Sequence, residues 1–206
     1  MIELNLAPLI TILSWEYPPR VVGQMAYEVD MIARRISQKL PVSVVTFHDA
    51  QYNMESISEK LEIHRVPNPV TPHATIVTWS VSLCSEIERI VADMYYDRAK
   101  KDMLIDVHGW HFIPAAVTLK KAIGIRFVFT PHSLEDHRTG NPSSALSSCI
   151  KGIEWLGLYE SEFVSVNSKW MLEEINKIHS VPSTKIKVFS DTDQLILSYQ
   201  GLLASQ

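Results

Sequence analysis

The sequence predicts an α/β fold: a doubly wound, mainly parallel sheet of about seven strands with helices on both faces. Short apolar runs rich in β-branched residues alternate with longer segments in which apolar residues recur at helical spacing. The connections between the apolar runs are long enough for the crossovers that parallel strands require. With 206 residues, 46% of them hydrophobic and 20% charged, the chain has the size and apolar content of one ordinary domain.

Seven short apolar segments have the composition of strands that are buried on both faces. They cover residues 9–13, 42–47, 61–66, 103–107, 126–130, 163–167 and 186–189. The first of them runs into the prolines Pro18 and Pro19, which fix the path of the following loop. Residues 48–60 and 134–143 are polar, and we expect irregular, turn-forming segments there.

The predicted helices lie between these strands and carry apolar stripes at helical spacing. They cover residues 21–40, 74–96, 112–122, 145–159 and 169–178. Pro41 and Gly124 are expected to end the first and the third helix, and Ser168 can cap the fifth.

The end of the chain does not continue this alternation. We expect residues 1–189 to form one domain and residues 190–206 to form an atypical C-terminal tail. The tail's apolar residues could form one helix for which the sequence offers no obvious partner, and these residues are Leu195, Ile196, Leu197, Leu202 and Leu203.

Composition excludes several classes of function. The net charge of −4 provides no basic field for binding nucleic acid. No run of about 18 apolar residues occurs, and residues 1–8 lack the basic start of a secretory signal. Cys84 and Cys149 lie far apart in apolar segments and match no metal or redox spacing. We therefore expect a soluble cytoplasmic protein with reduced cysteines, no membrane partner and no nucleic-acid partner.

Three of the predicted strands run into loops that are rich in polar and aromatic residues. These loops cover residues 14–23, 108–111 and 131–138. The carboxyl ends of parallel strands share one edge of a sheet, which is where open α/β sheets bind ligands. We therefore expect Arg20, His111 and His132 to surround a single cleft.

The histidines allow more than one interpretation. His108 and His111 lack the H-E-x-x-H spacing of a zinc site, and no G-x-S-x-G nucleophile motif occurs, so we predict no metal and no serine triad. His108 is either bonded to backbone or functional. His111 lies beside Trp110 at the start of a helix, which favours function.

The loop after the first strand also allows two interpretations. Arg20 and the helix start near Gly23 could bind a phosphate, or Arg20 could be an exposed side chain on a rigid loop. In the same way, Glu16 and Glu135 could bind sugar hydroxyls or face solvent. The indoles of Trp15 and Trp110 could stack on a sugar ring or cover the core.

Five motifs occur in an order that resembles the amino-terminal domain of retaining GT-B glycosyltransferases, with glycogen and starch synthases as the most similar members. They are SWEYPPRVVG (14–23), DVHGWH (106–111), FTPHSLE (129–135), EWLGLY (154–159) and VSVNS (164–168). The likeness extends over about residues 9–189.

The resemblance implies two Rossmann-like domains facing across a cleft. The activity that it implies is the retaining transfer of glucose from ADP-glucose or UDP-glucose to an α-1,4-glucan, without a metal or other cofactor. It implies that His111 lies at the reacting sugar and that Arg20, Gly23 and Gln24 lie on the donor side. The residues expected on the acceptor side are Glu16, Tyr17, Trp110, His132, Ser133 and Glu135.

The sequence departs from the family pattern in two places. Gln24 stands where the family has a second glycine, and its side chain can obstruct the approach of phosphates to the backbone. After Phe189, residues 190–193 replace the expected proline-asparagine-glycine turn into the donor domain. We therefore expect that the donor-binding half is missing and that this chain alone has little or no transferase activity.

Three hypotheses follow from these departures. The chain is half of an enzyme that works with a separate donor-binding domain, or it is a non-catalytic module that binds glucan or oligosaccharide. In the third hypothesis it is a truncated remnant, whose apolar tail covers the vacant domain surface or pairs two chains as a homo-oligomer.

Overall fold

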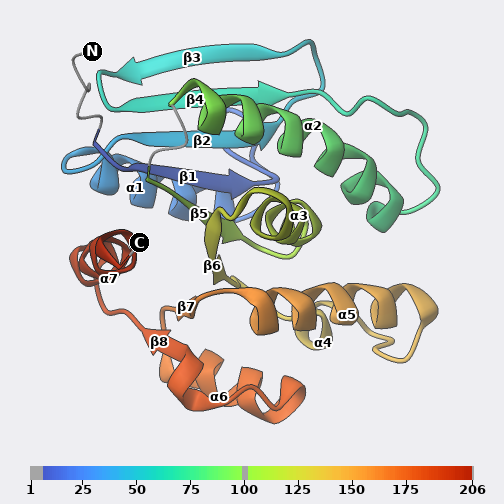
Figure 1. The fold of residues 1–206 in the computed structure, drawn as a ribbon. Coiled ribbons are helices and arrows are strands. Elements are labelled where there is room, and N and C mark those ends of the chain that lie inside the picture. The colour runs from blue at the N-terminus through green and yellow to red at the C-terminus, as the bar shows by residue number, and fades with distance from the viewer. Residues whose placement is uncertain (1–6, 99–101, 206) are drawn as a thin grey trace.

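The computed structural model describes residues 7–98 and 102–205, which form an eight-stranded sheet with helices on both faces (Figure 1). The expectation that residues 1–8 form no secretory signal therefore falls mostly outside the described residues. In chain order the strands are β1 (Leu9–Ser14), β2 (Val42–Phe47), β3 (Asn53–Ser58), β4 (Leu61–Val66), β5 (Met103–His108), β6 (Arg126–Thr130), β7 (Val164–Val166) and β8 (Ile186–Val188).

The sheet order is β3-β4-β2-β1-β5-β6-β7-β8, and every neighbouring pair is parallel except β3 with β4. All seven predicted strands are present, and the predicted fold class is confirmed. The additional strand β3 lies at the edge of the sheet with all six residues exposed. It was missed because an exposed edge strand needs no apolar pattern.

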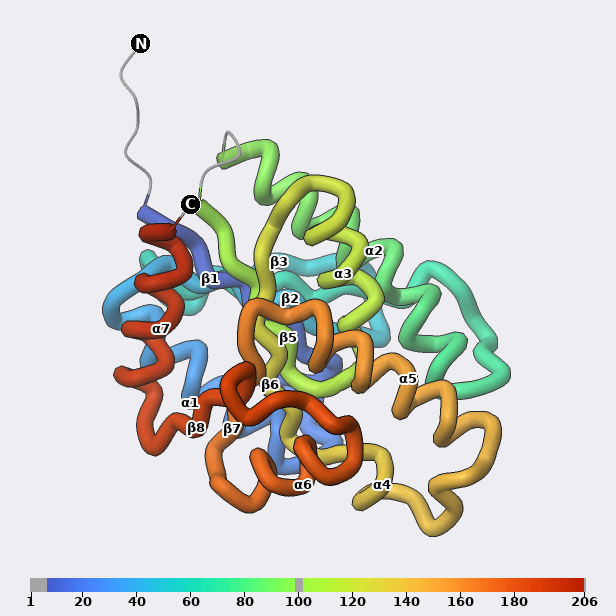
Figure 2. The backbone as a smooth tube through the Cα atoms, turned by 60° about the horizontal axis from the view of Figure 1, so that its bottom comes forward, coloured from blue at the N-terminus to red at the C-terminus, as the bar shows by residue number. Residues whose placement is uncertain are grey.

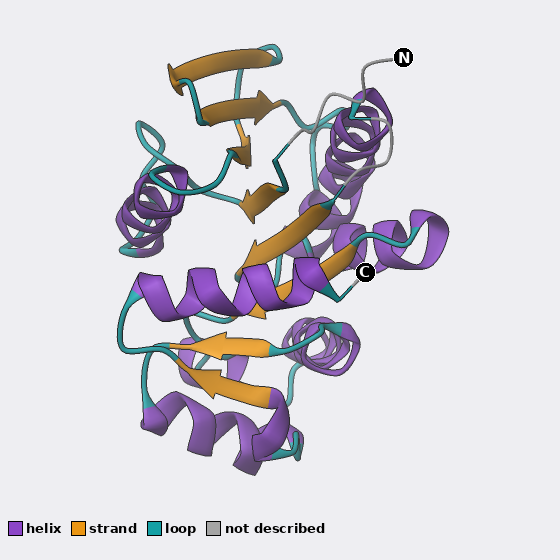
Figure 3. Ribbon diagram, turned by 60° about the vertical axis from the view of Figure 1, so that its left-hand side comes forward, coloured by secondary structure: helices purple, strands orange, loops and turns teal. Residues whose placement is uncertain are grey.

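The helices are α1 (Met25–Ser37), α2 (Ile76–Asp97), α3 (Ile113–Ile123), α4 (Glu135–Arg138), α5 (Ala145–Glu160), α6 (Lys169–His179) and α7 (Thr192–Ala204), and a short 3₁₀ turn covers Ser183–Lys185. Helices α2, α3, α5 and α6 pack on one face of the sheet, and α1 and α7 pack on the other (Figure 3). No helix within the described residues is both long and apolar enough to span a bilayer.

Helix α1 begins four residues later than predicted, at Met25 rather than at Val21. The carboxylate of Glu16 accepts hydrogen bonds from the backbone amides of Val22 and Gly23, so this segment stays in a loop. The short helix α4 falls in the segment that we expected to be irregular.

Helix α7 has a partner that the sequence did not reveal. It lies beside α1 (Figure 2) and buries Leu195, Ile196, Tyr199 and Leu203 in the same core as strands β1 and β2. The hydroxyl of Tyr199 donates a hydrogen bond to the buried carboxylate of Asp106 on β5. The helix expected in the tail is therefore present, and its partner, which was not obvious from the sequence, is α1.

Two glycines of α5 provide a matched test of the packing between α5 and α3. A Cβ atom at Gly157 would lie 2.5 Å from Cδ1 and 2.9 Å from Cγ1 of Ile113, whereas one at Gly152 would meet nothing within 4 Å. Alanine is favoured over glycine in helices by about 1 kcal/mol, and overpacking a core costs roughly 1–3 kcal/mol. We expect Gly152→Ala to raise the unfolding free energy.

By the same reasoning, Gly157→Ala should be about 1–3 kcal/mol less stable than Gly152→Ala. Urea denaturation of both variants measures the difference. Equal stability of the two would contradict the close contact between α5 and α3.

Candidate functional site

The carboxyl ends of β1, β5 and β6 lie side by side, because Ser14 pairs with His108 and His108 pairs with Thr130. The loops that follow these three strands line one cavity of about 330 Å³. Its wall includes Trp15, Gly23, Gln24, Trp110, His111 and His132. The three loops therefore gather at one edge of the sheet, as the topology predicts.

His111 lies in a cage of aromatic rings. Its imidazole stacks on the indole of Trp15 at 4.5 Å and on that of Trp110 at 4.1 Å, and it meets the edge of Trp79 at 6.3 Å between ring centroids. Its buried Nδ1 atom has no hydrogen-bond partner within the described structure. Burial, and secondarily the charges of Arg138 and Arg20, lower the pKa of His111 to about 3. The imidazole is therefore neutral near pH 7.

Gly109 lets the chain turn into this cage. Its φ of +75° lies in the left-handed region, where side chains with a Cβ atom are strained. The hydroxyl of Ser80 on α2 donates to the backbone carbonyl of His111. The turn at Gly109 and the contact with α2 together fix the position of the His111 ring.

The loop on the other side of the cavity holds its own anion. Glu16 is buried, and its Oε2 atom accepts from the amides of Val22 at 2.6 Å and Gly23 at 2.7 Å. The carboxylate of Glu16 thus takes the two backbone amides in the segment where we expected that a phosphate could bind. Gln24 lines the cavity next to them.

Three of the predicted site residues do not line this cavity. The guanidinium of Arg20 lies over the rings of Trp15 at 4.9 Å and Phe47 at 5.0 Å and donates to the carbonyl of Trp15. Tyr17 is buried, with its hydroxyl bonded to Asp30. Glu135 is also buried and accepts from Arg138 at 3.1 Å. These three side chains support the loops that form the cavity.

Arg138 and Ser133 lie in the wall of the cavity. The guanidinium of Arg138 donates to the carboxylate of Glu154 at 2.7 Å and to that of Glu135. Glu154 also accepts from the backbone amide of Glu135. This network of buried carboxylates holds α4 in place beneath the cavity.

A row of four hydrogen-bonded side chains runs from the cavity into the core; we call it the histidine row, and it consists of Glu28, His132, His108 and Asp106. Oε2 of Glu28 lies 2.8 Å from Nδ1 of His132, whose Nε2 lies 2.8 Å from Nδ1 of His108. Nε2 of His108 lies 3.0 Å from Oδ2 of Asp106. Sequence analysis missed Glu28, because a glutamate on an amphipathic helix gives no local signal of function.

Electrostatics favour ionised carboxylates at both ends of the histidine row. The hydrogen bond from His132 lowers the pKa of Glu28 against the effect of burial. Burial on its own raises the pKa of Asp106. Its interaction with His108 and the hydrogen bonds from Tyr199 and Thr130 outweigh this effect, so the pKa lies below its ordinary value. Burial also lowers the pKa of His132, with the hydrogen bond to Glu28 opposing it.

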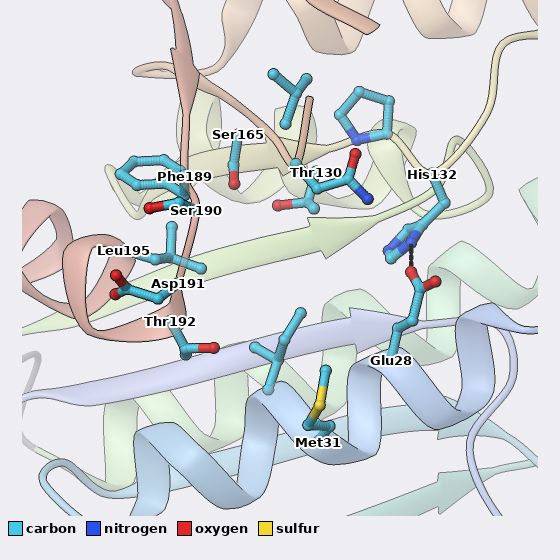
Figure 4. Close-up of a pocket in the computed structure, with 14 residues that line it drawn as sticks. Glu28, Met31, Thr130, His132, Ser165, Phe189, Ser190, Asp191, Thr192 and Leu195 are labelled. Atoms are coloured by element: carbon cyan, nitrogen blue, oxygen red, sulfur yellow. Dashed lines mark hydrogen bonds and ion pairs between the residues drawn. The ribbon is translucent and has the colours of Figure 1, made fainter. Parts of the chain in front are cut away.

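A second cavity, of about 280 Å³, lies at the ends of β6, β7 and β8 (Figure 4). Glu28 and His132 line both cavities and point toward each other at their junction. Met31, Phe189 and Leu195 give the second cavity an apolar side. No group of three or more potential metal ligands occurs in residues 7–98 and 102–205.

Indole faces, a neutral imidazole and a carboxylate form a site suited to a polar ring that carries hydroxyl groups. Aromatic faces can stack on the apolar face of such a ring, while histidine and carboxylate bind its hydroxyls. The pair Trp110 and His111, noted in the sequence, is thus joined by Trp15 and Glu28, which come from other elements.

Comparisons with known proteins give a consistent result. The profile of Glycosyltransferase Family 4 matches residues 23–190. An uncharacterised glycosyltransferase of Methanocaldococcus jannaschii is 32% identical over 184 residues, which are 87% of this chain and 45% of that protein. The chain thus spans about half the length of the curated relative that it matches.

Two solved structures illustrate the similarity of fold. A sucrose-phosphate synthase structure from Thermosynechococcus elongatus has a TM-score of 0.67 at 12% identity and covers 96% of this chain and 98% of its own. The catalytic domain of starch synthase IV from Arabidopsis thaliana, bound to ADP and acarbose, has a TM-score of 0.61 at 12% identity. The match covers 90% of this chain and 51% of that chain. At this identity the likeness concerns the fold.

Proposed function

The chain belongs to glycosyltransferase family 4, and on that premise we propose that it forms the acceptor-side half of a GT-B glucosyltransferase similar to glycogen and starch synthases. The reaction is the transfer of glucose from ADP-glucose or UDP-glucose to an α-1,4-glucan with retention. The observation that carries this proposal is the aromatic cavity around His111, which lies at the carboxyl ends of the strands and inside the segment matched by the family.

His111 is the residue that contacts the reacting sugar in this proposal. Its imidazole is neutral near pH 7, so it can bind a sugar hydroxyl without attracting an anion into the acceptor site. Trp15 and Trp110 stack on the imidazole of His111 and hold that ring in place.

Glucosyl transfer also requires cations around the leaving diphosphate, where negative charge develops. Among the described residues, Arg138 is the one lysine or arginine that lines the cavity around His111, and its guanidinium is already bonded to two glutamates. A second, donor-binding domain therefore supplies those contacts, either in a longer form of the protein or from a separate chain.

A second candidate is a module that binds glucan or oligosaccharide without catalysis. It is supported by the carboxylate of Glu16, which takes the amides of Val22 and Gly23 that a donor phosphate would use. In either function the two cysteines stay unpaired, which fits a reducing compartment such as the cytoplasm.

The first test is a titration of the 206-residue chain with maltoheptaose, followed by NMR or calorimetry. We expect binding with a Kd of roughly 1 mM, and much weaker binding of the β-linked control cellohexaose. No binding of maltoheptaose at about ten times that concentration would contradict both candidates.

A radiolabel assay separates the two candidates. With labelled ADP-glucose or UDP-glucose and glycogen, we expect the chain alone to show no turnover, because the diphosphate lacks cations. Turnover that appears when a donor-binding domain is added supports the half-enzyme, and binding that never leads to turnover supports the module. Ordinary turnover by the chain alone would overturn the requirement for a donor domain.

A further inference from the structure

The geometry of the histidine row fixes how many hydrogens its two imidazoles hold. An ionised carboxylate only accepts, so Nδ1 of His132 and Nε2 of His108 must each carry a hydrogen for Glu28 and Asp106. The hydrogen bond between Nδ1 of His108 and Nε2 of His132 needs a third hydrogen. The two imidazoles therefore hold three hydrogens, where a neutral pair holds two, and the row contains one imidazolium between two carboxylates.

Each ring of the row holds one of the two carboxylates in place. Asp106 is fully buried and also accepts from Thr130 at 2.8 Å and from Tyr199, so its carboxylate is ionised. His108 donates to Asp106, His132 donates to Glu28, and the contact between the two rings joins these pairs into one row.

This arrangement leaves a single polar atom of the row for a ligand. Both ring nitrogens of His132 are used within the row, although the family resemblance placed His132 among the residues on the acceptor side. Oε2 of Glu28 is bound to His132, while Oε1 has no hydrogen-bond partner within the described residues, and the side chain is 34% exposed. Glu28 is also the one acidic residue that lines both cavities within the described structure.

We propose that Glu28 binds a hydroxyl group of the saccharide at the junction of the two cavities, and that His132, His108 and Asp106 are positioning residues that hold its carboxylate in place. The inference rests on the proposed function and adds a binding residue to it. An ionised carboxylate is a strong acceptor for sugar hydroxyls. Asn167 lines both cavities as well and offers an amide beside it.

The charges of the second cavity restrict the ligand further. The acidic residues in its wall are Glu28 and Asp191, and no lysine or arginine of the described residues lines it. A phosphorylated sugar in this cavity would meet two negative charges without a cation. The saccharide that reaches this junction is therefore a neutral one.

Glu28→Gln tests the binding role. The glutamine keeps the shape of the side chain but removes its charge. Because a hydrogen bond to a charged group is stronger than one to a neutral group, we expect Glu28→Gln to bind maltoheptaose about tenfold more weakly. Glu86→Gln, on the surface of α2 and paired with Arg89, is the matched control and should bind like the unaltered chain. Equal affinities of the unaltered chain and Glu28→Gln would overturn the assignment of Glu28.

Nitrogen-15 NMR of labelled histidines tests the positioning role independently of any ligand. At neutral pH we expect three of the four ring nitrogens of His108 and His132 to be protonated, and two in Asp106→Asn, where the negative charge that holds the imidazolium is gone. Two protonated nitrogens in the unaltered chain would overturn the positioning role as described.

If Asp106→Asn does not fold, Tyr199→Phe provides the same test with a smaller change. It removes one hydrogen bond to Asp106 and keeps the ring in the core. We expect a shifted Nε2 signal of His108 together with weaker maltoheptaose binding, and an unchanged signal with unchanged affinity would overturn the positioning role.

The two proposals fail in different ways. Failure of the unaltered chain to bind maltoheptaose overturns the proposed function and the assignment of Glu28 with it. Binding that is insensitive to Glu28→Gln overturns the assignment of Glu28 alone.

Discussion

Deleting residues 191–206 is expected to unfold the domain. Helix α7 buries four large side chains, and these are Leu195, Ile196, Tyr199 and Leu203. Burial of one such side chain contributes roughly 1.5–3 kcal/mol, so losing all four removes on the order of 8 kcal/mol. That amount is comparable with the whole stability of an ordinary domain.

The buried carboxylate of Asp106 adds to this cost. Tyr199 is one of three side chains that donate to it, and a buried charge that loses a donor is poorly compensated. Exposing the apolar face of α1 and β1 should also promote aggregation. We therefore expect the deleted chain to be insoluble or to lack a cooperative urea transition.

Two single substitutions on the same helix refine this test. Tyr199→Ala removes a fully buried ring and should cost about 3–5 kcal/mol. Leu197→Ala is the matched control, because Leu197 is 66% exposed and its removal should change stability by less than about 0.5 kcal/mol. A deletion variant with the circular dichroism, mass and urea midpoint of the full chain would show that α7 is not part of the core.

Elements that leave a pattern in the local sequence could be predicted, and elements that depend on tertiary packing could not. Strands buried on both faces and helices with one apolar stripe leave patterns within a few residues, so the strands at the centre of the sheet could be predicted from local sequence. Strand β3 is exposed on all six residues and carries no such pattern. The partner of α7 is set by tertiary packing, which a local pattern does not contain.

For the candidate site, the positions of the loops could be predicted from the sequence, but the directions of the side chains could not. A topological rule brings the loops after β1, β5 and β6 to one edge, and it correctly indicated that His111 and His132 share a cavity. The rule does not fix where a side chain points, so Arg20 was expected in the cavity, whereas its guanidinium stacks on Trp15 and Phe47. Glu28 and His132 are 104 positions apart, and only the fold brings them into contact.

Acid is expected to destabilise the domain from about pH 6.5 downward, well before most carboxylates are protonated. The pKa of His111 is about 3 in the folded chain and about 6.5 in the unfolded chain. Between these values the unfolded chain binds a proton that the folded chain does not, so the unfolding free energy falls as the pH falls. At about 1.4 kcal/mol per pKa unit, the loss reaches on the order of 4 kcal/mol near pH 3.

His111→Gln should remove most of this loss, because glutamine has a similar size and does not titrate. Urea denaturation of both chains at pH 7.5, 5.5 and 4.5 measures the effect, and each chain serves as its own reference. At pH 7.5 His111 is neutral in both states, so the difference between the two chains there reports packing against Trp15 and Trp110 alone. The gap should then shift in favour of His111→Gln by about 1.4 kcal/mol for each pH unit below 6.5. A gap that stays constant from pH 7.5 to 4.5 would mean that His111 takes up its proton at the same pH in the folded and the unfolded chain, and the lowering of its pKa by burial would be excluded.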